Sequence, residues 1–302
     1  MIYSIALSLL LGSELTYYLL IVQTGVVSHF HSDLITLFPM FVGGVMGTWL
    51  SGFSWFGLKT PIHKIFIALA LQLYISLFYP DYNSFDLLLL GLAVGFMAPL
   101  GIYLFKAKQQ KEIFFALAIA YTVGTSFFTF DADLREPMAV IFSIIGILCA
   151  TVLKNYQIDM KTKTLSYPFI SYLPLMFWIL LDSNLFETLS RHNDINIWSN
   201  ETPTIIVFHI LGLIAAYFID MSKIKQNLFI AALFIASYLF SYLELPILLS
   251  IAYPFTISYY NVVVFTTLSK EANLSRLSFM MIFVGWVASG LGLAVAISNF
   301  LH

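Results

Sequence analysis

A carboxylate inside an apolar segment is the group best placed to do chemistry in this sequence. Glu14 lies deep within the first apolar segment, with apolar residues on both sides. An ionised carboxylate at the centre of a membrane span costs about 2.5–3.5 kcal/mol on insertion scales. Burial disfavours the charged form, which is what proton binding near neutral pH requires. We interpret Glu14 as a proton or cation site; the alternative is a structural acid. Tyr17 and Tyr18 share its helix face and could hydrogen-bond it.

A second group of polar residues lies in a later apolar segment. Asp182 and Asn184 fall in the outer half of a predicted span over 167–189, and Glu187 follows one turn further out. We expect Glu187 to be solvated at the external interface. Asp182 is either a substrate contact or part of the wall of a hydrated cavity. Two acids that face one cavity would favour a cationic substrate, or a proton exchanged against one.

Other polar side chains complete the candidate set. His209 lies near the middle of its span; hydrogen-bonded packing is the commoner role of a lone buried histidine, and a proton relay or metal ligand is the alternative. Tyr260 and Asn261 form the most polar part of their span and could line a cavity. The loop His29–Asp33 carries two histidines and an aspartate, which we expect to be solvated. We therefore predict no metal site and no cofactor.

The composition requires a membrane protein. Of the 302 residues, 60% are hydrophobic and 10% are charged, whereas soluble domains carry about 25% charged residues. Apolar runs of about 20 residues recur along the chain, and in lipid such runs must be helices. The predicted spans are 3–25, 34–54, 61–79, 84–105, 112–130, 137–154, 167–189, 203–220, 226–243, 245–268 and 276–300. The fold class is an all-α polytopic transmembrane bundle of about 11 spans.

The basic residues predict the orientation, because Lys and Arg near span ends stay on the cytoplasmic side. With eleven spans, all of the 14 basic residues except Arg135 and Arg191 fall on one side. The N-terminus is then cytoplasmic and His302 external, in what we expect to be a bacterial inner membrane. The net charge of −2, without a basic cluster, argues against nucleic acid as a partner.

The two halves look like weak copies of each other. Each half opens with a span that carries one buried acid, and both opening spans enter the membrane in the same sense. Parallel repeats of this kind occur in transporters. We expect a six-helix half over 1–154, a cytoplasmic linker over 155–166 and a five-helix half over 167–302.

This arrangement resembles the major facilitator superfamily, with its last helix missing. The best local support is the stretch Gly212–Asp220 followed by Lys223 and Lys225, which is similar to a degenerate Gly-Asp-basic loop of that family. The resemblance implies alternating access, with Asp220 as the acid of a cytoplasmic gate and Lys223 or Lys225 as its basic companion. The corresponding first-half stretch, Gly47–Gly52, contains no acid.

We therefore expect a secondary transporter, not an enzyme, that moves a small polar or cationic solute and is coupled to protons. Glu14 would be the coupling carboxylate and Asp182 its partner or the substrate contact. The partners would be a small-molecule or ion substrate and membrane lipid. The alternatives are a membrane-embedded enzyme, a lipid-handling or partner subunit without transport activity, and a ten-helix drug/metabolite-type transporter fold built from inverted repeats.

Overall fold

The computed structural model describes residues 1–30, 33–53, 60–105, 110–130, 134–156, 168–191, 197–271 and 273–298, and all regular structure within these ranges is helical. The first half contains α1 (Ile2–Tyr17), which continues through the π-helical segment η1 (Tyr18–Val26) into α2 (Val27–His29), then α3 (Leu34–Ser51), α4 (Pro61–Ser76), α5 (Ser84–Leu104), α6 (Gln110–Phe127) and α7 (Arg135–Leu153). Each of these helices coincides with one predicted span to within a few residues.

The second half has the same kind of organisation. A 3-10 turn, η4 (Phe169–Tyr172), leads into α8 (Leu173–Arg191), and the short α9 (Ile197–Asn200) precedes α10 (Thr202–Phe218), α11 (Lys223–Tyr242) and α12 (Pro246–Leu268). The last crossing is made of α13 (Leu274–Met281), the π-helical segment η6 (Ile282–Val287) and α14 (Ala288–Ile297). The described chain thus confirms the prediction of an all-α bundle with eleven crossings.

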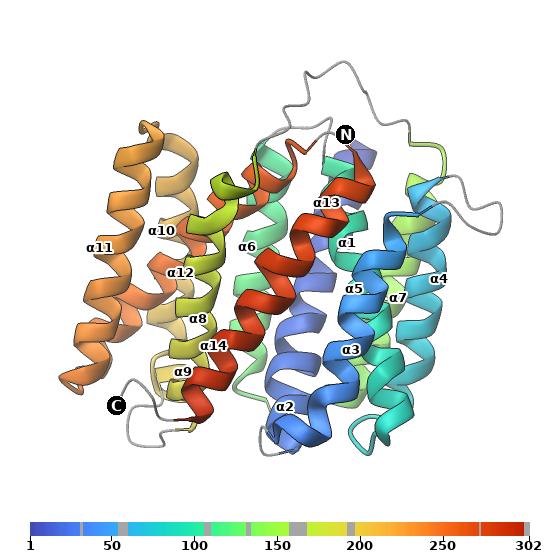
Figure 1. Ribbon diagram of the computed structural model, residues 1–302, viewed down its shortest axis with the longest axis horizontal. Helices are drawn as coiled ribbons and strands as arrows, with labels where there is room; N and C mark the ends of the chain where they lie inside the picture. Colours follow the sequence, from blue (N-terminus) through green and yellow to red (C-terminus); the bar gives the residue numbers. More distant parts are fainter. Residues whose placement is uncertain are drawn as a thin grey trace.

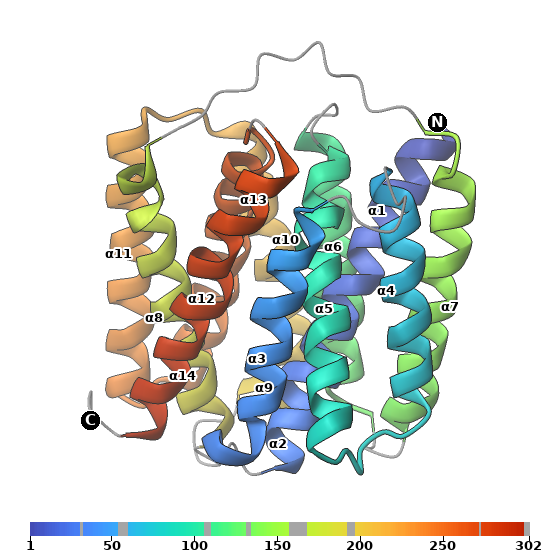
Figure 2. The ribbon, with the colours of Figure 1, turned by 45° about the vertical axis from the view of Figure 1, so that its right-hand side comes forward.

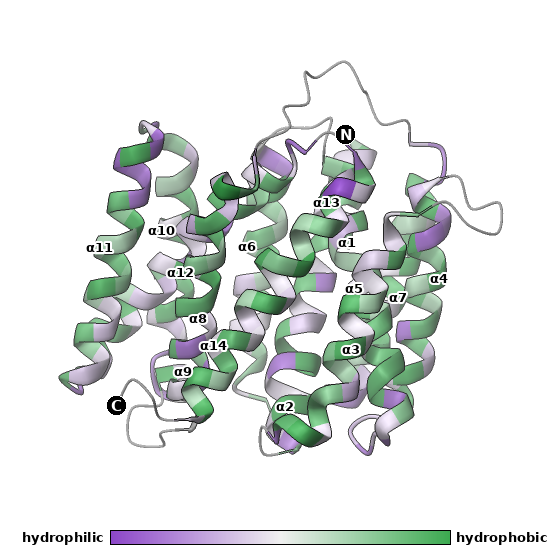
Figure 3. Cartoon of the chain, viewed as in Figure 1, coloured by the Kyte–Doolittle hydropathy of each residue, from purple (hydrophilic) through white to green (hydrophobic). Residues whose placement is uncertain are grey.

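The helices cross the molecule in alternating directions (Figures 1 and 2). Eight of those described are long and apolar enough to span a membrane, and α4 and α10 are apolar but shorter. Hydrophobic colour covers most of the helical surface, while α11 and α4 are hydrophilic at their upper ends (Figure 3). The molecule is therefore an integral membrane protein whose helices lie across the bilayer.

We call the end of the bundle at which α1 begins the basic end. Among the described basic residues, it carries Lys64, Lys111, Lys154, Lys223, Lys225, Lys270 and Arg276, and the opposite end carries Arg135 and Arg191. Both α1 and α8 begin at the basic end (Figure 2), as parallel repeats require. The predicted linker 155–166 lies mostly outside the described residues, so the division of the chain at that point stays a prediction.

Polar side chains satisfy backbone groups at the ends of two crossings. Lys64 is buried, and its Nζ donates to the carbonyl oxygens of Ser51 at 2.8 Å and Phe53 at 2.6 Å. It thus satisfies carbonyl groups that the end of α3 leaves without helical partners. Asn83 and Asp86 form a capping box at the start of α5.

The two halves lie side by side (Figure 1) and meet along two seams. In one seam α6 packs against α10 and α12, and in the other α13 packs against α3 and α5. Within the first half, α3 and α5 approach until their backbones touch. A methyl group added at any of four glycines would clash with the facing backbone; these are Gly43, Gly47, Gly91 and Gly95. These glycines, spaced Gly-x-x-x-Gly in each helix, therefore allow the two helices to pack closely.

Candidate binding cavity between the two halves

A cavity of about 310 Å³ lies between the halves. Its walls come from α1 and η1, α3, α5 and α6 of the first half, and from α8, α9, α10, α12 and the last crossing of the second. Its ionisable side chains, apart from tyrosines, are Glu14, Asp182, Glu187 and His209. Small-molecule sites commonly have volumes of about 300–1,000 Å³, so the cavity can hold a small solute.

Asp182 is one of two acids in the second-half wall, with Glu187, and two tyrosines orient its carboxylate. Tyr253 donates to Oδ1 at 2.8 Å, and Tyr260 donates to Oδ2 at 2.6 Å. Both tyrosines come from α12, whereas Asp182 comes from α8. Asp182 is partly exposed, whereas Tyr253 and Tyr260 are buried. Two hydrogen bonds thus fix the orientation of a carboxylate that lines the cavity.

His209, Tyr260 and Asn261 belong to one polar chain that joins the two halves. Asn261 donates from Nδ2 to the hydroxyl of Tyr121 at 2.7 Å, and Tyr121 stacks on the His209 ring with centroids 4.2 Å apart. His209 Nδ1 pairs with the Ser258 hydroxyl at 2.7 Å. Tyr121 comes from α6 of the first half. His209 comes from α10, and Ser258 and Asn261 come from α12 of the second half. The sequence did not single out Tyr121 as part of this site, since a tyrosine in an apolar segment is most often packing.

Glu14 has a different environment, in the wall of the first half. It is 9% exposed, and its Oε1 accepts a hydrogen bond of 3.1 Å from Gln72 Nε2. The Gln72 amide also lies 3.4 Å from the Ser143 hydroxyl. These contacts join α1, α4 and α7. No basic side chain forms an ion pair with Glu14 among the residues that the structure describes.

The expected hydrogen bonds from Tyr17 and Tyr18 to Glu14 are wrong. The Tyr17 hydroxyl pairs with Ser76 at 3.0 Å, and the Tyr18 hydroxyl bonds to Ser289. A tyrosine ring carries its hydroxyl beyond a carboxylate one helical turn away, so both hydroxyls reach neighbouring helices instead. Tyr18 still lines the cavity and links the first crossing to the last.

Two expectations for the outer part of α8 also change. Glu187 is 5% exposed and lines the cavity, so its predicted solvated position is wrong. The short α9 folds over this end of the bundle, where Trp198 packs on Phe186 with ring centroids 5.3 Å apart. Asn184 is buried, and its Oδ1 accepts from the Tyr238 hydroxyl at 2.8 Å. It is not among the residues that line the cavity, so its contacts are interhelical.

Both π-helical segments contribute to the cavity wall. Tyr18 and Gln23 come from η1, and Val284, Gly285 and Trp286 come from η6. Thr24 donates to the carbonyl oxygens of Leu19 at 2.7 Å and Leu20 at 3.2 Å. Such segments are frequent at functional sites. Hydropathy alone could not reveal them, because an apolar π turn and an apolar α turn have the same composition.

The predicted gate residues lie away from the cavity. Asp220, Lys223 and Lys225 are exposed in and after the turn between α10 and α11, at the basic end. None of them lines the cavity.

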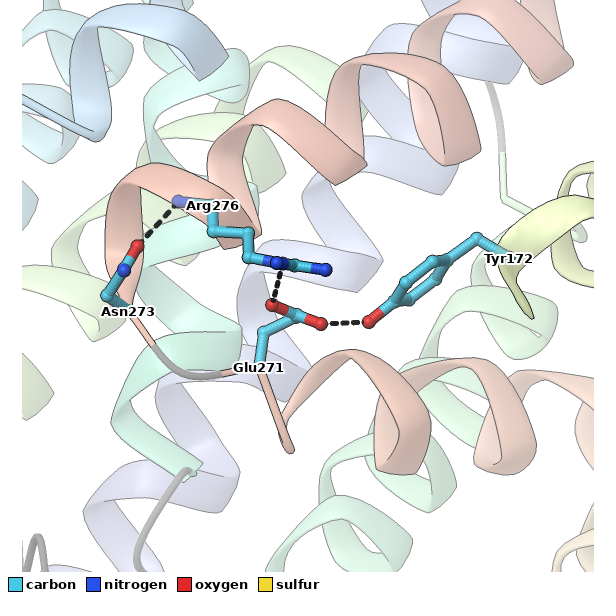
Figure 4. Close-up of polar contacts among 4 residues, drawn as sticks. All are labelled: Tyr172, Glu271, Asn273 and Arg276. Atoms are coloured by element: carbon cyan, nitrogen blue, oxygen red, sulfur yellow. Dashed lines mark hydrogen bonds and ion pairs between the residues drawn. The ribbon is translucent and has the colours of Figure 1, made fainter. Parts of the chain in front are cut away.

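A buried cluster at the basic end was missed by sequence reasoning (Figure 4). Glu271 is 1% exposed, accepts a hydrogen bond from Tyr172, and pairs with Arg276 Nε at 2.8 Å. The cluster joins η4, the turn that follows α12 and the start of α13. In the sequence, Lys270-Glu271 reads as an ordinary solvated turn.

Comparison with known proteins identifies the fold of this chain but not its family. The sequence matches no protein-family model, and no curated protein matches it significantly. A solved structure of the major facilitator superfamily proton:xylose symporter XylE, bound to 6-bromo-6-deoxy-D-glucose, is similar with a TM-score of 0.69 and 14% sequence identity. The match covers 99% of this chain and 90% of that chain. This chain therefore has the fold of the major facilitator superfamily.

Proposed function

We propose that this protein is a secondary transporter that moves a small polar or cationic solute by alternating access, coupled to protons. The observation that carries the proposal is the cavity between the two halves, with Glu14 in the wall of the first half and Asp182 and Glu187 in the wall of the second half. The similar structure is that of a proton:xylose symporter, which supports transport as the activity.

Glu14 and Asp182 differ in exposure and in hydrogen-bond partners, which suits them to two different roles. Asp182 is partly exposed to the cavity, so a solute can reach it. Glu14 is buried, and a neutral amide is its hydrogen-bond donor. A carboxylate in such a place gains and loses a proton more readily than it keeps a permanent charge. Glu14 is then the proton site and Asp182 the solute contact.

Alternating access requires contacts between the halves that can break at each end in turn. At the basic end, Ser51 pairs with Ser278 at 2.8 Å and Ser275 donates to the Gly52 carbonyl at 2.6 Å. At the opposite end, Phe128 stacks on Trp198 with ring centroids 5.5 Å apart. These are contacts that would have to break as each end opens. Asp220 with Lys223 or Lys225 would add a gate at the basic end.

The basic end would face the cytoplasm of a bacterium, because most of the Lys and Arg residues lie there. The described residues contain no group of three or more His, Cys, Asp or Glu side chains that could hold a metal ion. We propose transport in preference to membrane enzymology because the acids sit in opposite walls of a cavity rather than together at one interface.

The test begins with a thermal-shift screen of solutes on detergent-purified protein, since a ligand that binds only the folded state raises its stability. A stabilising solute is then added to proteoliposomes that enclose a pH-sensitive dye. We expect solute-dependent proton movement in the wild type. Glu14→Gln should lose that movement but keep solute exchange, and Asp182→Asn should lose both. Glu136→Gln is the matched control, because Glu136 is an exposed carboxylate at the opposite end, outside the cavity. Proton movement that survives in Glu14→Gln refutes the assignment.

A further inference from the structure

The charge of the cavity wall selects among solutes. Its described lining residues include three carboxylates, Glu14, Asp182 and Glu187, and no Lys or Arg. Electrostatic interactions are strong where water is excluded. An anionic solute would meet negative charge without a counter-charge in this wall. A cationic solute would be attracted.

The hydrogen-bonding capacity of the wall argues against a sugar. A sugar presents several hydroxyl groups, and each one left unpaired on binding costs affinity. The side-chain amides of the lining are Gln23 and Asn261, and Asn261 already donates to Tyr121. The Tyr260 hydroxyl already donates to Asp182. The polar groups are thus largely committed within the protein, although the similar structure is that of a xylose symporter.

The remaining lining is mostly apolar, and it includes aromatic and methionine side chains among aliphatic ones. Aromatic faces attract cations as well as apolar groups. Methionine side chains are flexible and polarisable, so they adapt to apolar ligands of different shape. These lining residues include Phe41, Phe128, Trp286, Met40, Met97 and Met281.

Asp182 retains room for a third donor. Tyr253 and Tyr260 each occupy one position on its two oxygens, and an ionised carboxylate offers about four acceptor positions. Because Asp182 lines the cavity and is partly exposed, a solute in the cavity can reach the acceptor positions that the tyrosines leave open. A charged N–H group placed there would form a charge-assisted hydrogen bond.

We propose that the solute is an amphipathic organic cation, with its ammonium group on Asp182 and its apolar part against the aromatic and methionine walls. This inference deepens the proposed function and rests on it for the solute being transported. The binding itself does not depend on transport.

The experiment is calorimetric titration of the detergent-purified full chain with matched probes. The probes are 4-phenylbutylamine, its neutral analogue 4-phenylbutanol, methylammonium, benzoate and D-xylose. We expect the phenyl amine to bind at least about tenfold more tightly than the alcohol and than methylammonium, because only it offers both the charge and the apolar group. In Asp182→Asn the preference for amine over alcohol should disappear, while Asp182→Glu should retain part of it. Glu136→Gln should behave as the wild type, and titration of protein-free micelles gives the heat of partitioning.

The outcomes separate the two proposals. Tighter binding of D-xylose or benzoate than of the amine, or no binding of the amine, overturns the solute class while leaving transport open. An amine preference that is unchanged in Asp182→Asn overturns the assigned contact. Binding of the amine with loss in Asp182→Asn, but without its movement into proteoliposomes, supports the inference and refutes the proposed function.

Discussion

Removing the guanidinium of Arg276 should destabilise the basic end of the bundle, because it leaves a buried carboxylate without its counter-charge. The Glu271 side chain is 0% exposed and that of Arg276 is 32% exposed. Opposite charges about 4 Å apart attract by about 4 kcal/mol at an effective dielectric constant of about 20. Losing one partner of a fully buried pair costs about 3–5 kcal/mol. Because water reaches part of Arg276, we expect a loss of about 2–3 kcal/mol for Arg276→Ala.

A double-mutant cycle isolates this ion pair from the other effects of the substitution. Unfolding in SDS, followed by tryptophan fluorescence, would give the free energy of unfolding for the wild type, Arg276→Ala, Glu271→Gln and the double variant. We expect Arg276→Ala to cost less in the Glu271→Gln background by about 1–2 kcal/mol. Tyr172→Phe, which removes the other donor to Glu271, should cost about 1.5–3 kcal/mol. Equal costs of Arg276→Ala in both backgrounds would refute the reasoning, because the carboxyl group would then not be charged in the folded protein.

Two further predictions concern the first half. Gly91→Ala should destabilise the protein by about 1–3 kcal/mol in the same assay, because the added methyl group would meet the Met40 backbone. The control is Gly285→Ala, whose methyl group would meet open space and should cost nothing. Equal effects of the two substitutions would contradict close packing of α3 on α5. Asp33 begins α3, and the Thr36 hydroxyl and the Ile35 N–H lower its pKa from the ordinary value of 3.8. The ionised Asp33 side chain therefore stabilises the protein above about pH 4, and this contribution is lost as the pH falls through the lower pKa of the folded state. The melting temperatures of the wild type and Asp33→Ala should converge in acid. A constant difference would show that the charge of Asp33 does not contribute to stability.

The sequence alone predicted which segments of the chain cross the membrane. Each crossing is determined locally, because an apolar segment in lipid must satisfy its own backbone hydrogen bonds as a helix. This is why the predicted span 84–105 agrees with α5 and 226–243 with α11. The unfavourable insertion of Glu14 and Asp182 into lipid likewise marked them as candidates, and both line the cavity.

Contacts between helices were decided by the tertiary structure, because they depend on how far each helix is rotated and on what covers its ends. Sequence spacing placed Tyr17 beside Glu14, but the nearest donor is Gln72, from a helix that follows much later in the chain. Glu187 was expected in water, but it is buried and lines the cavity between the halves. The pairing of Glu271 with Tyr172 has no signal in the sequence, since η4 lies far from Glu271 along the chain and only the fold brings the two together. Local chemistry thus determined the helices and the candidate acids, and packing decided which side chains each acid meets.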